Sequence, residues 1–114
     1  MKVTVIGAGG HVGLPFSLVV ADAGHTVYGV DINEELILQL NSGVVPYVEH
    51  GASELLFKNL ESGNIVFTTD STFIKDSDVI AVMLGTPVDA ENNPRLDDLF
   101  NFIDASLEIG RAHV

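Results

Sequence analysis

The 114-residue sequence contains no cysteine and no tryptophan. Without a thiol, the chain forms no disulfide and carries no cysteine nucleophile. A cysteine-free sequence is typical of a reducing compartment, so we expect a cytoplasmic protein. The four histidines are scattered without the paired spacing of metal ligands, and we therefore expect no metal site.

Basic residues are scarce. Five lysines and arginines stand against sixteen acids, which gives a formal net charge of −11. Nucleic-acid binding requires a basic surface, so this composition excludes nucleic acid as a partner. If such an acidic chain binds an anionic ligand, it must do so with backbone amides, which a glycine-rich turn at the start of a helix supplies.

Long hydrophobic runs are also missing. The longest is Val79-Ile-Ala-Val-Met-Leu84, far below the roughly 20 residues of a membrane-spanning helix, so we expect no membrane partner. A run of this length predicts a strand that is buried on both faces. A strand is predicted almost at the start of the sequence, so we expect no signal peptide. Its hydrophobic content of 46% predicts a globular chain with one core.

The most informative feature is the amino-terminal segment. An apolar run, Lys2-Val-Thr-Val-Ile6, enters the turn Gly7-Ala-Gly-Gly-His-Val-Gly13. An apolar helix follows, and a second apolar run then ends at Asp31. This strand, glycine-rich turn, helix, strand and acid are the parts that hold a dinucleotide, in the required order. The amino end of the helix presents N–H groups and a partial positive charge to a pyrophosphate.

The glycine spacing is one residue longer than GxGxxG, because Val12 stands where a frame from Gly7 requires the third glycine. We assign Gly10 as the glycine that the cofactor approaches and Gly13 as the glycine that packs helix against strand. The tight turn then falls on either Gly7 or Gly9. We expect the backbone to bind the cofactor through all six of these positions: Gly7, Gly9, Gly10, His11, Val12 and Gly13.

The His11 imidazole is not expected to be catalytic, because the amino end of a helix disfavours its protonated form. Asp31 lies 24 residues after Gly7, close to the spacing of about 20 residues expected for the acid that binds the adenosine ribose. Its carboxylate would repel a 2′-phosphate, and no lysine or arginine lies nearby in the sequence. NAD is therefore favoured over NADP.

The remaining patterns predict alternating strands and helices. We expect a helix over 11–23 with an apolar stripe, a second helix capped by Asn33, a third over 53–60, a short helical piece over 71–75 and a last helix over 96–107. Gly24 and Gly43 are expected to end the first two helices. The stripe of the first helix comprises Val12, Phe16, Val19, Val20 and Ala23.

Further strands are expected over 64–68 and 78–84. This order predicts an α/β fold with a doubly wound, Rossmann-type parallel sheet in strand order 3-2-1-4, incomplete on its C-terminal side. The ligand crevice then lies at the carboxyl ends of the first and fourth strands. Residues 85–87 reach the same edge as the glycine-rich turn, so Thr86 is expected to contact the cofactor.

Four segments carry a family resemblance. They are Gly-His-Val-Gly-Leu-Pro at 10–15, Ala-Gly-His-Thr-Val at 23–27 with Asp31, Pro-Tyr-Val-Glu-His-Gly at 46–51 leading to Glu54-Leu-Leu56, and Gly-Thr-Pro-Val-Asp at 85–89. In this order they resemble the amino-terminal NAD-binding domain of the nucleotide-sugar 6-dehydrogenases, which act on UDP-glucose, GDP-mannose and UDP-N-acetylmannosamine. The resemblance covers residues 2 to about 104. Departures include His50 in place of a frequent proline, and Asn33-Glu-Glu35 where a basic residue often follows the ribose acid.

The resemblance implies oxidation of the sugar C6 hydroxyl to a carboxylate with reduction of two NAD, and a role in polysaccharide biosynthesis. It also implies that the catalytic cysteine, a lysine and the sugar-binding residues lie in later domains. The nucleotide sugar would therefore be a partner only through those domains, and the fragment alone would be inactive. A homodimer is expected for the full-length protein. We expect residues 1–108 to be a partial NAD-binding domain and 109–114 to be a non-native tail, the alternative being a natural short terminus.

Two other functions remain open. One is a non-catalytic NAD-binding module, such as a sensor. The other is a fragment of an extended short-chain epimerase or reductase, which also uses GxxGxxG but requires a Tyr-x-x-x-Lys pair. Ile32 and Gly51 stand four residues after Tyr28 and Tyr47, so neither tyrosine has the lysine. Tyr47 and Glu49 either order the loop over the cofactor or serve the structure alone.

Overall fold

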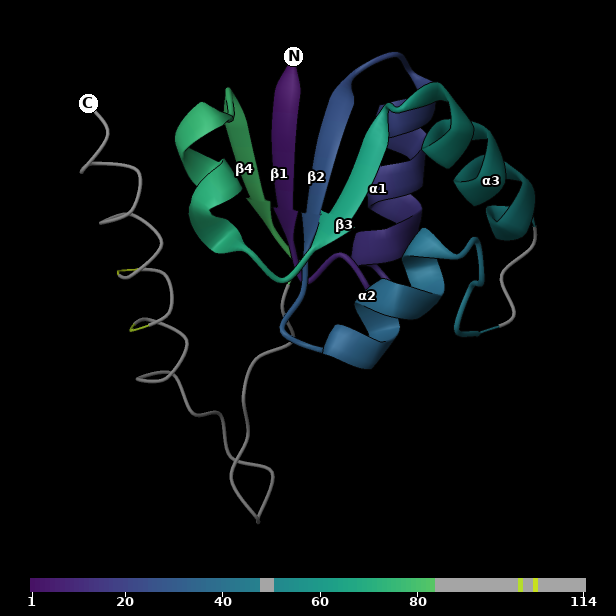
Figure 1. The fold of residues 1–114 in the computed structure, drawn as a ribbon. Coiled ribbons are helices and arrows are strands. Elements are labelled where there is room, and N and C mark those ends of the chain that lie inside the picture. Colours follow the sequence, from purple (N-terminus) through teal and green to yellow (C-terminus); the bar gives the residue numbers. More distant parts are fainter. Residues whose placement is uncertain (48–50, 84–100, 102–103, 105–114) are drawn as a thin grey trace.

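A computed structural model describes residues 1–47 and 51–83 together with Asn101 and Asp104, and all structural statements refer to these residues. Four parallel strands form one sheet in the order β3-β2-β1-β4 (Figure 1). They are β1 (Lys2–Ile6), β2 (Thr26–Val30), β3 (Ile65–Thr68) and β4 (Val79–Val82). The predicted α/β class and strand order are confirmed.

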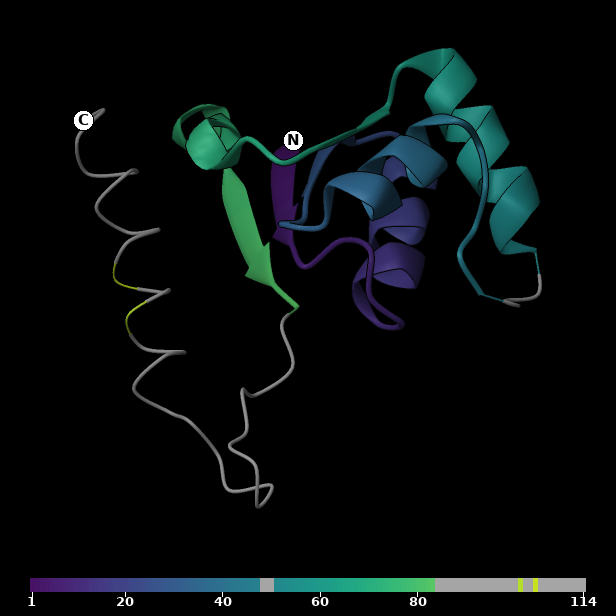
Figure 2. The same ribbon diagram turned by 60° about the horizontal axis from the view of Figure 1, so that its bottom comes forward.

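The strands direct alternate residues to two faces of the sheet. Val3, Val5 and Val27 belong to the main core with helices α1 (Gly13–Asp22), α2 (Glu34–Asn41) and α3 (Ala52–Ser62). Ile6 and Val30 point the other way and pack on Ile74 of the 3-10 helix η1 (Ser71–Asp76). The three α-helices therefore cover one face and η1 the other (Figure 2). At their carboxyl ends, β1 leads into the glycine-rich turn and β2 leads to Asp31.

Local signals begin and end the helices as the sequence predicts. The Asn33 side chain accepts a hydrogen bond of 3.1 Å from the amide of Leu36 and caps α2. Gly24 follows α1 with a φ of 101°, and Gly43 follows α2 with a φ of 83°. Glycine adopts this left-handed backbone without the steric cost that a Cβ brings. The caps thus fix where β2 begins and where the chain turns back after α2.

The predicted apolar stripe of α1 is wrong. Val12 and Val19 are 67% and 62% exposed, and Phe16 also reaches the surface. The buried residues of α1 are Gly13, Leu14, Ser17, Leu18 and Ala21. The helix is apolar nearly all round, so periodicity fits either face. The packing of Gly13 against the glycine-rich turn determines which face of α1 is buried.

The prediction that β4 is buried on both faces is also wrong for its described part. Val79, Ile80 and Val82 are 42%, 38% and 40% exposed. Among the described residues, β4 pairs only with β1, and the α-helices pack over β1, β2 and β3. Residue 84 of the predicted strand, the polar segment with Thr86, the predicted helix over 96–107 and the segment 109–114 lie outside the described residues.

Candidate dinucleotide-binding site

Gly7 makes the tight turn after β1. It has a φ of 83°, a backbone conformation that side chains rarely adopt. Its amide and that of Ala8 both donate to the carbonyl of Val30, at 2.8 and 3.2 Å. These bonds hold the start of the turn against the end of β2. Of the two glycines considered for this role, the structure therefore selects Gly7.

Gly13 packs the first turn of α1 against that tight turn. A Cβ built on Gly13 would lie 2.1 Å from the carbonyl oxygen of Gly7 and 3.1 Å from the Cα of Ala8. Both obstacles are backbone atoms that cannot move aside. Any side chain at residue 13 would thus push the helix away from the sheet. The role assigned to this glycine from the sequence agrees with its surroundings.

The amino end of α1 offers amides for an anion. Within the turn, the Gly10 amide donates to Gly7 O at 3.2 Å, and the Leu14 amide donates to Gly10 O at 3.0 Å. Within the described part of the chain, no acceptor takes the amides that lie between them, those of His11, Val12 and Gly13. Three consecutive N–H groups at the positive end of a helix fit a pyrophosphate.

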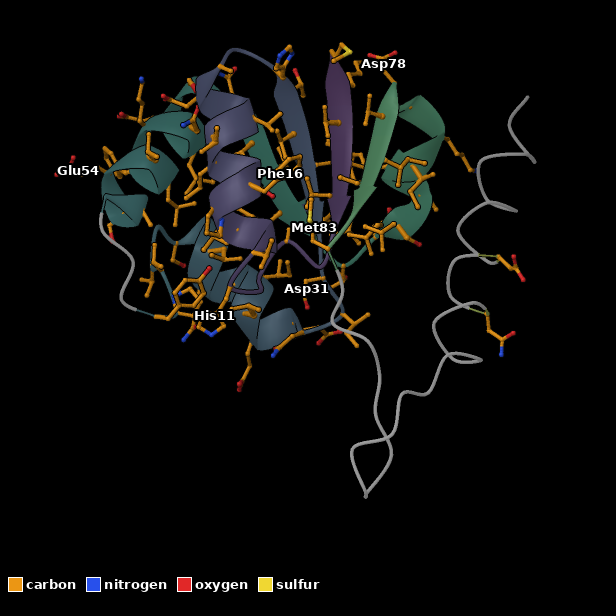
Figure 3. The ribbon with its side chains drawn as sticks, turned by 180° about the vertical axis from the view of Figure 1, so that it is seen from behind. His11, Phe16, Asp31, Glu54, Asp78 and Met83 are labelled. Carbon is orange, nitrogen blue, oxygen red and sulfur yellow. The ribbon has the colours of Figure 1, made fainter. Side chains whose placement is uncertain are left out.

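Asp31 lies one residue beyond β2 and is fixed by two backbone amides. Its Oδ2 accepts from Gly9 N and its Oδ1 from Asn33 N, each at 3.1 Å. Figure 3 shows His11 and Asp31 at the same end of the sheet, with Asp78 at the opposite end. An ionised carboxylate offers about four lone-pair sites, so both oxygens can still accept ribose hydroxyls. The structure thus brings the predicted ribose acid to the predicted phosphate turn.

Gly9 is packed more closely than the sequence indicated. A Cβ built on it would lie 2.1 Å from Cδ2 of Leu36 and 3.1 Å from Oδ2 of Asp31. A Cβ on Gly10, by contrast, would meet among the described residues only the Gly7 carbonyl oxygen, at 3.5 Å. The described part of the chain therefore leaves space beside Gly10, and the expected approach of the cofactor there stays a prediction.

A cavity of about 250 Å³ opens beside Asp31. It is mainly apolar and lies at the carboxyl ends of β1, β2 and β3, lined by Ile6, Gly7, Val30, Asp31, Ile32, Thr69 and Ser71. Our sequence reasoning missed Ile32, Thr69 and Ser71. A signal was available, because Ile32 lies two residues after β2 and Thr69 directly follows β3, and both strands end at this edge of a parallel sheet. Ile32 is 89% exposed and so has a free apolar surface at the cavity.

Tyr47 joins the site from the segment after α2. Its hydroxyl donates to the carbonyl oxygen of Gly10 at 2.9 Å. Its ring stacks on the His11 imidazole, with centroids 4.2 Å apart and an interplanar angle of 29°. Glu49, His50 and Thr86 lie outside the described residues. Within the described ranges, no group of three acidic or histidine side chains is placed to hold a metal ion, and no helix is long and apolar enough to cross a membrane.

Comparison with known proteins agrees with this site. Residues 1–113 match the NAD binding domain of the UDP-glucose/GDP-mannose dehydrogenase family. A UDP-glucose 6-dehydrogenase of Rhizobium meliloti is 43% identical over 88 residues, which cover 76% of this chain and 20% of that enzyme. Known relatives thus extend well beyond the part that this chain matches.

Two solved structures show the same architecture. A UDP-D-ManNAc dehydrogenase of Pyrococcus horikoshii superposes with a TM-score of 0.85 at 31% identity, covering 96% of this chain and 26% of that protein. A GDP-mannose dehydrogenase of Pseudomonas aeruginosa, solved as a ternary complex, gives a TM-score of 0.81 at 31% identity, covering 90% and 23%. With the match of 1–113, these similarities show that the chain belongs to the UDP-glucose/GDP-mannose dehydrogenase family, as an NAD-binding domain of that family.

Proposed function

We propose that the amides of His11, Val12 and Gly13 bind the pyrophosphate of NAD. The main observation behind this proposal is that the turn carrying these amides lies next to Asp31, at the end of β2. The Gly9 amide links that turn to the carboxylate, so the phosphate and ribose positions have a fixed separation. In an acidic chain, backbone amides are the groups suited to an anionic ligand.

The adenosine end of NAD fits the cavity next to Asp31. The carboxylate accepts hydrogen bonds from the ribose hydroxyls, and the apolar cavity beyond it takes the adenine, with the Ile32 side chain beside it. A flat, apolar base buries surface against such side chains. A 2′-phosphate in the same place would meet the charge of Asp31, which disfavours NADP.

The full-length protein would be a nucleotide-sugar 6-dehydrogenase that oxidises the C6 hydroxyl of a UDP- or GDP-sugar to a carboxylate. When bound, the nicotinamide of NAD accepts the hydride. The residues described here bind and orient the cofactor, and Thr86 is proposed as an additional contact. The catalytic thiol would come from a further domain, because the 114 residues contain no cysteine.

A labelled-amide NMR titration with NAD tests the binding mode. Amides of His11, Val12 and Gly13 should shift on addition of NAD, while the amide of Asp78, at the opposite end of the sheet, should not. Shifts confined to other edges of the sheet would contradict the proposed site.

Activity is tested separately by following NAD reduction with UDP-glucose, GDP-mannose or UDP-N-acetylmannosamine. The chain alone should give no more NADH than a control without protein. Turnover above that control would contradict the proposal that the catalytic groups lie in another domain.

A further inference from the structure

The segment that follows α2 places one side chain directly on the glycine-rich turn. Tyr47 is half-buried, packs against the main core, and donates its hydroxyl proton to the carbonyl oxygen of Gly10 at 2.9 Å. Its ring lies against His11 with the centroids 4.2 Å apart. The tyrosine thus contacts both residues that share the peptide bond between positions 10 and 11.

That peptide bond links the contact to the phosphate site. A trans peptide unit is planar, and its C=O and N–H groups point in opposite directions. The Gly10 carbonyl and the His11 amide belong to one such unit. When the Tyr47 hydroxyl fixes the carbonyl on one side, it therefore fixes the direction of the His11 N–H on the other side.

The turn needs such a restraint. Glycine rotates freely about φ and ψ, and Gly9 and Gly10 are consecutive. A rotated peptide between residues 10 and 11 would direct a carbonyl oxygen, with its partial negative charge, towards the position of the pyrophosphate. The Leu14 amide also donates to this carbonyl, at 3.0 Å, but it belongs to the same turn and helix. Tyr47 adds a contact to this carbonyl from a distant part of the chain.

We infer that Tyr47 is a positioning residue for the NAD pyrophosphate, acting through its hydrogen bond to the Gly10 carbonyl. This inference rests on the proposed NAD site and gives the segment after α2 a function in it. The tyrosine does not touch the cofactor in this account. It holds the His11 amide in the orientation that binds the phosphate, so its loss weakens phosphate-bearing ligands and leaves adenosine binding unchanged.

The test uses the complete 114-residue chain and the variant Tyr47→Phe, which keeps the ring and removes the hydroxyl. Tyr28→Phe is the matched control, because Tyr28 also stacks on an aromatic ring, that of Phe73, with centroids 4.7 Å apart on the face covered by η1. Dissociation constants for NAD, ADP and adenosine are measured by NMR titration, together with the melting temperature of each unliganded protein.

For Tyr47→Phe, the dissociation constants of NAD and ADP should rise roughly three- to tenfold, the effect of one net hydrogen bond. The adenosine constant and the melting temperature should match those of Tyr28→Phe. Unchanged NAD affinity would overturn the inference. Equal weakening of NAD and adenosine, or a melting temperature well below that of the control, would also overturn it, because Tyr47 would then act through the fold. If the wild-type chain bound no NAD, the proposed function itself would fail, and the role of Tyr47 with it.

Discussion

The amide of Gly9 donates a hydrogen bond of 3.1 Å to the carboxylate of Asp31, and this bond joins the glycine-rich turn to the end of β2. A second amide, that of Asn33, holds the other carboxylate oxygen at 3.1 Å. Asp31 is therefore oriented before any ligand arrives. Such preorganisation reduces the entropy lost on binding, so the ribose contact adds more to affinity than a freely rotating side chain would.

The packing of Gly9 against Leu36 predicts a strong energetic coupling. In Gly9→Ala, the new Cβ would lie 2.1 Å from the Leu36 side chain, which must move, and such overpacking costs about 1–3 kcal/mol. In the double variant Gly9→Ala with Leu36→Ala, the obstacle is gone. The double variant should therefore lose less unfolding free energy than the sum of the losses of the two single variants. Urea unfolding of the four proteins measures this. Gly10→Ala is the control, because its Cβ would meet one atom among the described residues, at the ordinary contact distance of 3.5 Å. Strict additivity would contradict the packing described here.

Gly10 and Gly13 should respond differently to substitution by valine. Gly13→Val should lose both stability and NAD binding, because backbone atoms of Gly7 and Ala8 block the side chain. Gly10→Val should keep its melting temperature and lose NAD binding, because its side chain would occupy the space that the cofactor enters. Circular dichroism melts and NAD titrations separate the two effects. Normal NAD binding by Gly10→Val would mean that the close-approach glycine is misassigned.

Much of the fold could be predicted from local sequence signals. Asn33 before two glutamates indicates a helix start, and Gly24 after an apolar run indicates a helix end, because both act through their own backbone neighbourhood. The strand order follows from alternating strands and helices together with the handedness of crossovers. The glycine-rich turn and Asp31 were recognisable because binding a dinucleotide requires that spacing.

The parts that the sequence did not reveal depend on contacts between distant residues. Phe16 and Leu18 are equally apolar, and only the packing of Gly13 on Gly7 decides which of their faces turns inward. The burial of β4 depends on what lies next to it, not on its own composition. The contact of Tyr47 with Gly10 spans 37 residues and has no periodic signal.

Stability should fall in acid through two aspartates with lowered pKa values. The hydrogen bond from Lys58, followed by that from Asn59, lowers the pKa of Asp22, and the bonds from Thr72 lower that of Asp70. Each lowered pKa contributes stability at pH values above the ordinary aspartate pKa of 3.8. This contribution is lost as the pH falls through the lower pKa of the folded protein. Urea midpoints between about pH 2 and 6 should therefore drop at the acid end.

Lys58→Met isolates the contribution of Asp22, since the Lys58 ammonium lies 2.9 Å from its carboxylate. The variant should show a shallower acid decline than the wild type, and added salt should reduce the difference. An identical decline in both proteins would show that this ion pair does not contribute.

The exposed side chains of β4 predict self-association. Val79, Ile80 and Val82 lie together on a strand that pairs, within the described ranges, only with β1. Sedimentation at increasing concentration should show oligomers, and Val82→Lys should shift them towards monomer. Val19→Lys, at a residue that is 62% exposed on helix α1 and not on a strand edge, is the control and should have little effect. A concentration-independent monomer would contradict this prediction.

The central claim is that Asp31 makes this an NAD site, and calorimetric titration with NAD and NADP tests it most directly. The wild-type chain should bind NAD more tightly than NADP, and Asp31→Ala should weaken NAD by roughly 1–3 kcal/mol and narrow the preference. Asp78→Ala is the control, because Asp78 also accepts a backbone hydrogen bond, from Lys2 at 2.9 Å, but at the far end of the sheet. Equal or tighter binding of NADP by the wild-type chain would contradict the account.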